Sequence, residues 1–507
     1  MYNKKQEDSL KERYFYKLST NLAGLGIGAF IQAIIPRGLG PKTFGDFNFL
    51  ITFFTQIINF FDMGSSTGFY AKVSHRPREF KLISFYFCFS AVAALIIISF
   101  VTLAQLMGLR NVLWPGQPLI YLYLALLLAV FVWISDIMAK IADAYGLTVP
   151  AEKAKIFQKL CALAALIVLF LCNKLSLIIF FLYNYCILAL LVVMFWRIFK
   201  KNGYDVLRDW KITISEIKKY TAEFYAYSHP FFLFGLIAMI AGLLQRWLLQ
   251  VFAGSVEQGF FGLSYQIGAI SFMFTSAMTL LIMREFSIAY NNKDINLMAR
   301  LFRKHVPLLY AITALIACFM AANADRITIM MGGGQFKGAV LAVGVMAFYP
   351  IHQVYGQLSG SVFYAADRTR LYCNIGILFF LLSIPITYLL IAPRKCFGLE
   401  AGALGLACQV VLIQFLAVNV QLYFNSRLLK FSFRKYLLHQ LACVAVFFTI
   451  AIFSRLTTDR ILIVSGVAVR FLLCGILYLI IAFIFIYLIP GVIGAKRSDY
   501  KFLSRGT

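Results

Sequence analysis

The segment Arg37-Gly-Leu-Gly-Pro-Lys-Thr-Phe-Gly-Asp-Phe47 lies between two apolar stretches, and its spacing returns near residue 254. The repeated pattern is G-x4-G-x-F, formed first by Gly40, Gly45 and Phe47 and again, 214 positions later, by Gly254, Gly259 and Phe261. Glycine suits a tight turn because it adopts backbone angles that other residues resist. The repeat therefore predicts two similar halves, each with a glycine turn between an outgoing and a returning helix.

The composition indicates a membrane protein. The 507 residues are 61% hydrophobic and 13% charged, whereas a soluble protein is about half apolar and about a quarter charged. A helix needs roughly 20 apolar residues to cross a bilayer core of about 30 Å, and fourteen such stretches occur. They are 16–36, 47–70, 83–107, 118–142, 155–172, 175–196, 223–252, 259–283, 305–323, 338–363, 371–392, 399–425, 436–454 and 466–489. We expect an all-α integral membrane protein.

The fourteen spans divide into six, six and two. The predicted parts are an N-terminal lobe at 1–196, a cytoplasmic connector at 197–222, a C-terminal lobe at 223–425, and two extra spans with a tail at 426–507. Six crossings return the chain to its starting side, so the two lobes form a parallel repeat. In transporters built this way the substrate path usually runs between the repeats.

The basic residues indicate topology and not nucleic-acid binding. The formal net charge is +26, yet the Lys and Arg residues are scattered over short loops. If both termini are cytoplasmic, about three quarters of the 47 basic residues fall on the inner side, as the positive-inside rule expects. We therefore expect a multi-pass membrane protein with both termini cytoplasmic.

Enzyme and metal signatures are missing from the sequence. Nine of the ten cysteines fall in apolar spans and no C-x-x-C occurs, so neither a disulfide framework nor a cysteine metal site is predicted. There is no P-loop or zinc-protease pattern. We expect no enzymatic activity and no cofactor.

Four polar residues inside the spans are candidates for function, because each ionisable group in hydrocarbon is costly and tends to face protein or water. Arg246 lies eight residues before Gly254, and its repeat counterpart is Gln32. We expect the two to face each other across a central cavity; the alternative is that Arg246 reaches out to the membrane surface. Asp62 and Asp136 are candidates for coupling to H+ or Na+.

The tenth predicted span carries a polar face. It contains His352, Gln353 and Gln357, and the two glutamines lie one helical turn apart. Amides and hydroxyls beside aromatic rings suit sugar groups, but amides also join membrane helices to one another. Both interpretations stay open.

Several stretches resemble one transporter family. The first two spans read RGLGPKTFGDFNFLITFFTQIINFFDMGSSTGFY, which is similar to the start of bacterial Wzx-type polysaccharide flippases. Three later stretches resemble the same family: LLQRWLLQVFAGSVEQGFFGLSYQIGAI at 243–270, MMGGGQFKGA at 330–339 and YAADRTRLY at 364–372. The resemblance covers essentially the whole chain. It implies membership of the multidrug/oligosaccharidyl-lipid/polysaccharide exporter superfamily.

The resemblance also implies a mechanism. Two lobes would alternate access to move an undecaprenyl-diphosphate-linked oligosaccharide from the inner to the outer leaflet, for O-antigen, capsule or a related polymer, beside a polysaccharide polymerase and chain-length proteins. Arg246 would offset the diphosphate, and Arg37 would act at the outer mouth. Many relatives carry an acidic residue before the arginine, but here it is Gln245. A drug or small-ion exporter is the alternative, and a membrane polysaccharide polymerase is third.

Overall fold

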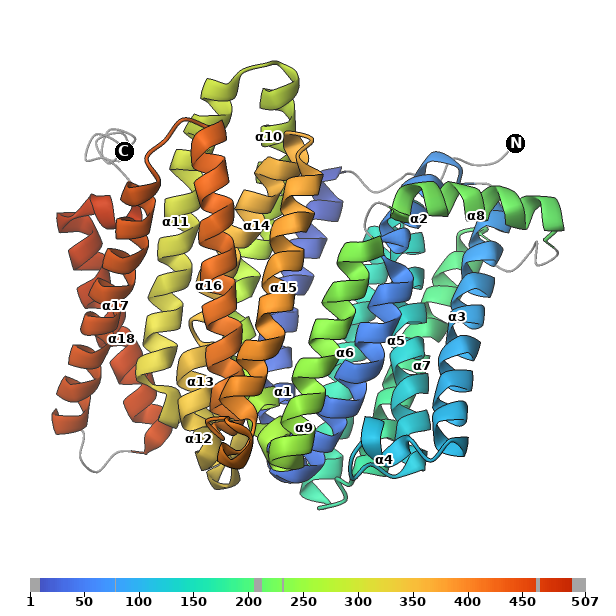
Figure 1. Cartoon of the computed structure of the whole chain (residues 1–507), viewed down its shortest axis with the longest axis horizontal. Coiled ribbons are helices and arrows are strands. Elements are labelled where there is room, and N and C mark those ends of the chain that lie inside the picture. Colours follow the sequence, from blue (N-terminus) through green and yellow to red (C-terminus); the bar gives the residue numbers. More distant parts are fainter. Residues whose placement is uncertain (1–9, 78, 205–211, 230–231, 462–465, 495–507) are drawn as a thin grey trace. The chain divides into compact units, whose positions relative to one another are not determined.

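A computed structural model describes residues 10–77, 79–204, 212–229, 232–461 and 466–494 of the chain (Figure 1). All regular structure in these residues is helical. Eleven of the helices found there are long and apolar enough to cross a membrane. The predicted all-α membrane fold is confirmed.

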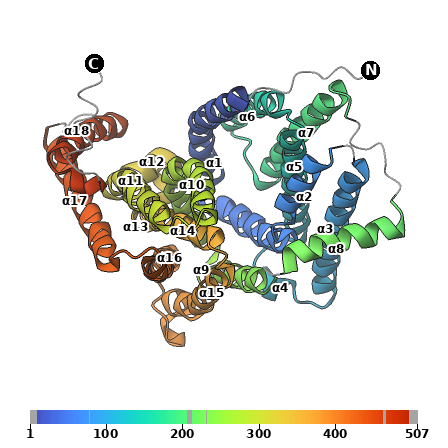
Figure 2. The same ribbon diagram turned by 90° about the horizontal axis from the view of Figure 1, so that it is seen from above.

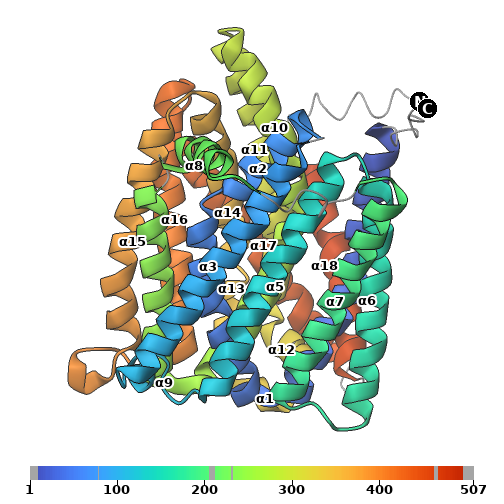
Figure 3. The same cartoon turned by 90° about the vertical axis from the view of Figure 1, so that its right-hand side faces the viewer.

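The chain divides into two compact units, residues 1–251 and residues 252–507. Helices of the first unit are α1 (Leu10–Asp62), α2 (Ser65–His75), α3 (Phe80–Leu106), α4 (Arg110–Leu113), α5 (Leu119–Ala144), α6 (Thr148–Leu171), α7 (Leu177–Lys201), α8 (Ile214–Ser228) and the first part of α9 (Phe232–Ala269). In Figure 3 the long helices α3, α5, α6 and α7 run side by side. Helix α8 instead crosses the ends of α2 and α3, as Figure 1 shows.

The second unit contains the remainder of α9 and the rest of the chain. Its further helices are α10 (Met273–Asn291), α11 (Ile295–Ala322), α12 (Ala324–Gly332), α13 (Val340–Met346), α14 (Tyr349–Ala365), α15 (Thr369–Ile391), α16 (Gly402–Leu428), α17 (Phe433–Ile461) and α18 (Val467–Leu488). Each unit has its own core. Trp114 is fully buried in the first, against the rings of Phe53 and Phe54, and Tyr310 packs edge-on against Tyr355 in the second.

The two longest helices bend at the first glycine of the repeated pattern. Gly40 has φ 73° and ψ 167° within α1, and Gly254 has φ 80° and ψ −175° within α9. These angles are open essentially to glycine alone. Gly45 and Gly259 are buried and helical. The first glycine of each pattern therefore makes the bend. The helix resumes directly after it, where the sequence suggests a loop.

The observed helices account for the predicted spans. Because the bends are so short, α1 contains the first predicted span and most of the second, and α9 contains most of the seventh and part of the eighth. The predicted C-terminal lobe begins at 223, whereas residues 232–251 pack within the first unit. There the rings of Phe232 and Phe60 lie 5.7 Å apart, joining α9 to α1.

The last two helices extend the second unit. Figure 2 shows α17 beside α11, with α18 next to α17. Arg455 of α17 donates to both oxygens of Asp325 at the start of α12, at 2.9 and 2.8 Å, and Arg326 pairs with Asp459. On α18 the large side chains of Ile476 and others are more than half exposed, as expected of a surface that meets lipid.

We expect Gly254→Ala to lower the stability of the protein by about 1–3 kcal/mol, because alanine cannot relax at these backbone angles. A Cβ added at Gly254 meets no atom of the described residues within 4 Å, so the loss would come from the backbone alone. The matched control is Gly28→Ala, a helical glycine of α1 with equally open surroundings, where alanine favours the helix. Thermal unfolding in detergent would measure both. Equal melting temperatures for the two variants would contradict the assignment.

Candidate functional site

Arg246 and Gln32 both lie in the first unit and are half-buried. Each stands eight residues before the bend of its helix, or about 12 Å at the helical rise of 1.5 Å per residue. The part of α9 that carries Arg246 is held firmly. Near the bend, the Trp247 indole donates to the Val112 carbonyl at 2.7 Å and the Gln250 amide donates to the Pro115 carbonyl at 3.2 Å.

A glycine contact fixes the same part of α9 from a second side. A Cβ added at Gly242 would lie 3.0 Å from the side-chain amide of Gln56 on α1. Arg246 therefore lies on a part of α9 that contacts α1 at Gly242. Arg37, the candidate for the outer mouth, is exposed three residues before the bend at Gly40.

Asp62 ends α1 and is surrounded by hydrogen-bond donors. Its carboxylate accepts from the Tyr86 hydroxyl at 2.9 Å, from the Ser66 hydroxyl at 2.8 Å and backbone N–H at 3.2 Å, and from the Ser65 hydroxyl at 3.4 Å. Lys140 of α5 in turn donates to Ser66. The aspartate thus joins α1, α2, α3 and, through Ser66, α5.

Asp136 lies one turn before Lys140 on α5 and is exposed. The structure therefore separates the two coupling candidates by environment. Asp62 is enclosed by protein donors, whereas Asp136 reaches the surface of the first unit.

The glutamines of the predicted tenth span join helices inside the second unit. Gln353 of α14 accepts a hydrogen bond from Gln414 of α16. Gln357, one turn further along α14, accepts from the Thr279 hydroxyl of α10 at 3.0 Å. These hydrogen bonds join α14 to α16 and to α10. Joining of membrane helices is one of the two interpretations that the sequence leaves open.

His352 faces a different environment from its neighbours. Its ring lies edge-on to Phe415 at 5.0 Å, and it lines a cavity of about 650 Å³ together with Tyr310 and Gln440. Gln440 belongs to α17, so α17 forms part of the wall of this cavity. Nδ1 of His352 has no hydrogen-bond partner among the described residues.

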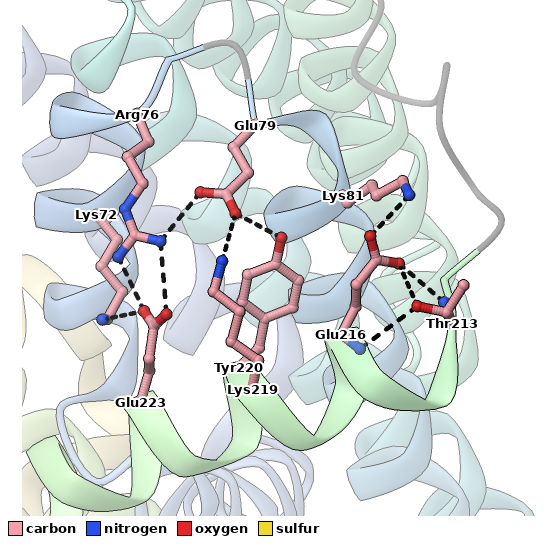
Figure 4. A network of polar contacts seen from close by, with 9 residues as sticks. All are labelled: Lys72, Arg76, Glu79, Lys81, Thr213, Glu216, Lys219, Tyr220 and Glu223. Carbon is pink, nitrogen blue, oxygen red and sulfur yellow. Dashed lines mark hydrogen bonds and ion pairs between the residues drawn. The ribbon is translucent and has the colours of Figure 1, made fainter.

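Helix α8 is docked on the first unit by ion pairs, which the sequence analysis did not predict (Figure 4). Glu223 accepts from Lys72 at 2.6 Å and from Arg76 at 2.9 Å, and Arg76 also donates to Glu79 at 3.1 Å. The Tyr220 hydroxyl donates to Glu79 at 2.7 Å. These contacts connect the connector helix to the end of α2 and the start of α3.

The first turn of α8 adds a second anchor. Thr213 and Glu216 form a capping box, and Lys81 of α3 donates to Glu216 at 2.7 Å. These hydrogen bonds, that from Lys81 first, lower the pKa of Glu216 to about 2. The hydrogen bond from Lys72 likewise lowers the pKa of Glu223. The spacing T-x-x-E was the one sequence signal that marked this helix start.

Comparisons with known proteins agree with this architecture. The sequence profile of the family described as "Polysaccharide biosynthesis protein" matches residues 10–282. A solved structure of the lipid II flippase MurJ in an inward closed conformation is similar with a TM-score of 0.65 and 13% identity, over 94% of this chain and 98% of that one. A search of curated proteins gives no significant match.

Two solved structures of multidrug resistance MATE family transporters of the MOP superfamily are also similar. The inward-facing one has a TM-score of 0.60 and 14% identity, over 82% of this chain and 96% of that one. The outward-facing one has a TM-score of 0.53 and 14% identity, over 83% and 96%. At these identities the likeness establishes the fold.

We expect Glu223→Gln to weaken the docking of α8 and to lower stability by about 1 kcal/mol, the scale of a partly exposed ion pair. The matched control is Glu285→Gln, whose partner Arg284 is exposed, and it should change stability little. Because the pKa of Glu223 is lowered, its contribution is present above the ordinary value of 4.5 and is lost as the pH falls below it. Thermal unfolding at pH 7 and pH 4 would measure this. Equal effects of the two variants at pH 7 would contradict the role of the ion pairs.

Proposed function

This chain belongs to the polysaccharide biosynthesis protein family, and from that premise we propose that it is a flippase for undecaprenyl-diphosphate-linked oligosaccharide repeat units. It moves them from the inner to the outer leaflet of the bacterial cytoplasmic membrane, with both termini cytoplasmic. The polymer served is O-antigen, capsule or a related surface polysaccharide. The fold, which it shares with a lipid II flippase, supports transport of this kind.

The observation that carries the proposal is the half-buried Arg246. A diphosphate cannot enter hydrocarbon without a counter-charge, because charges there are strongly destabilised. Arg246 is the only charged residue of 232–251, a stretch of spanning helix. Its planar guanidinium matches the geometry of phosphate oxygens and stays protonated at all relevant pH values.

The sugars need hydrogen-bond partners in place of water. Gln32 in the first unit, and His352, Gln353 and Gln357 in the second, are the candidates. Each glutamine amide has more than one donor and acceptor, so Gln353 and Gln357 keep hydrogen-bonding capacity beyond the contacts that join their helices. Nδ1 of His352 also retains its capacity. Arg37 would meet the substrate at the outer mouth.

The driving force would be an ion gradient, with H+ or Na+ as the coupling ion. Asp136 is the better-placed of the two carboxylate candidates, because it is exposed and can exchange protons or cations. The Asp62 carboxylate, by contrast, already accepts hydrogen bonds from protein hydroxyl groups. A polysaccharide polymerase and chain-length proteins are the proposed partners.

A second candidate function is export of drugs or small ions. The similarity in fold to the inward-facing MATE transporter supports it. An exporter of cations would be expected to have carboxylates along its substrate path, whereas the candidate residue in this chain is Arg246, which is positively charged. We therefore place the flippase first.

Deletion of the gene in its host separates these functions. If the protein is the flippase, lipid-linked repeat units accumulate on the inner leaflet and surface polysaccharide is lost. Mass spectrometry of extracted lipids and staining of surface polysaccharide would detect both changes. Normal surface polysaccharide together with reduced dye export would overturn the flippase proposal in favour of the exporter.

We expect Arg246→Ala to reduce translocation at least about tenfold, since a lost charge-assisted contact to phosphate costs about 1.5–3 kcal/mol. Arg246→Lys should retain part of the activity because it keeps the charge. Arg284→Ala, at an exposed arginine, is the control. Appearance of repeat units in the outer leaflet, at matched protein levels, is the readout. Full activity in Arg246→Ala would remove this residue from the mechanism.

A further inference from the structure

An aromatic pocket lies within the first unit, under the connector helix α8. It has a volume of about 460 Å³ and is lined mainly by rings, among them Phe61, Phe85, Phe89, Phe224 and Phe232. No lysine, arginine, aspartate or glutamate of the described residues lines it. A mostly apolar pocket of this size with a few polar groups is typical of a small-molecule or lipid site.

The pocket is formed before any ligand arrives. Phe224 of α8 stacks on Phe85 of α3, with ring centroids 5.8 Å apart and planes 12° apart, and it also contacts Tyr86 at 5.6 Å. The ion pairs of Figure 4 hold the neighbouring face of α8 against α2 and α3. Helix α8, which covers the pocket, is therefore held against α2 and α3 by contacts on two of its faces.

One polar atom in the pocket is unsatisfied. Ser228 ends α8, lines the pocket and is 8% exposed, and its hydroxyl has no hydrogen-bond partner among the described residues. A buried hydroxyl normally has a partner, and leaving it without one costs free energy. The occupant should therefore offer an uncharged hydrogen-bond acceptor next to an apolar body.

The depth of the pocket narrows the choice of occupant. On α3, the charged residues Glu79 and Lys81 stand at the helix start, and Phe85 and Phe89 follow within about three turns, or about 15 Å. Polarity thus falls from charged to aromatic over the distance that separates lipid headgroups from acyl chains. The ester carbonyls of glycerolipids lie at that boundary.

We infer that this pocket binds one acyl chain of a membrane glycerolipid, with the ester carbonyl accepting a hydrogen bond from Ser228. An ester is a neutral acceptor attached to a hydrocarbon chain, which matches an uncharged aromatic pocket with one orphaned hydroxyl. A polyprenyl phosphate would bring an anion to a lining that offers no lysine or arginine and, as a basic group, only the exposed His229. The bound lipid fills the space between α8 and the bundle and supports the docked connector.

The test compares two lipids that differ only in the acceptor. The purified full-length protein is stripped of lipid in detergent and titrated with dioleoylphosphatidylethanolamine or with its dialkyl ether analogue, and native mass spectrometry measures the affinity of the first lipid bound. We expect the ester lipid to bind about fivefold more tightly, the scale of one hydrogen bond. The variant Ser228→Ala should bind the two lipids equally.

A pocket-filling variant tests the location. Ser228→Phe should weaken the first binding event at least about tenfold by occupying the space of several methylene groups. The matched control is Ile217→Phe, on the exposed side of α8, which should bind as the original protein does. If Ser228→Phe does not fold, the ester and ether comparison with Ser228→Ala still decides.

Three results would overturn the inference: equal binding of ester and ether lipids by the original protein, an unchanged ester preference in Ser228→Ala, or tighter binding of undecaprenyl phosphate than of the ester lipid at this site. None of these bears on the flippase proposal, because lipid binding in detergent is measured without transport.

Discussion

A chain in hydrocarbon must satisfy its own backbone, because no water is there to accept or donate hydrogen bonds. This requirement explains why every regular element of the described residues is a helix and why the breaks between helices are so short. At Gly40 and Gly254 the chain turns within a single residue and then resumes its helical hydrogen bonding. At the start of α16, the Glu257 carboxylate accepts the backbone N–H of Ala403 at 2.6 Å, which satisfies one of the amides that a helix start leaves without a helical partner.

The same requirement governs polar side chains, and it changes how they should be interpreted. Asp62, Gln353 and Gln357 attract notice in the sequence because they are polar groups in apolar spans. In the structure each has partners on other helices, so each contributes to packing whatever else it does. Arg246 is likewise a polar group in an apolar span, and it is the only charged residue of 232–251.

The sequence predicted the helices and the two bends well, because span length and glycine spacing are local consequences of the bilayer. Contacts between segments that are far apart in the chain could not be predicted from the sequence. Nothing in the order of residues indicated that Glu223 meets Lys72, or that Gln353 meets Gln414. His352 and Gln353 are adjacent in the chain, yet successive residues of a helix point about 100° apart, and only His352 lines the cavity beside α17.

A third copy of the glycine pattern lacks the phenylalanine. Gly333 has φ 74° and ψ −174°, nearly the angles of Gly40 and Gly254, and Gly338 follows it with the same spacing. The phenylalanine that completes the other two patterns is replaced there by Val340. The backbone geometry depends on the first glycine, so the aromatic residue was a poor criterion for finding it.

The ion pairs of α8 have an electrostatic consequence for the face on which they lie. Lys72, Arg76, Lys81 and Lys219 face three carboxylates, so most of their charge is neutralised within a few ångströms. A formal charge of +26 suggests a strongly positive surface, but around α8 little of that charge remains to attract anionic lipid headgroups. Far from the helix these four basic residues and three carboxylates act like a single cation, to which the exposed Lys218 of α8 adds a second, so added salt has little left to screen.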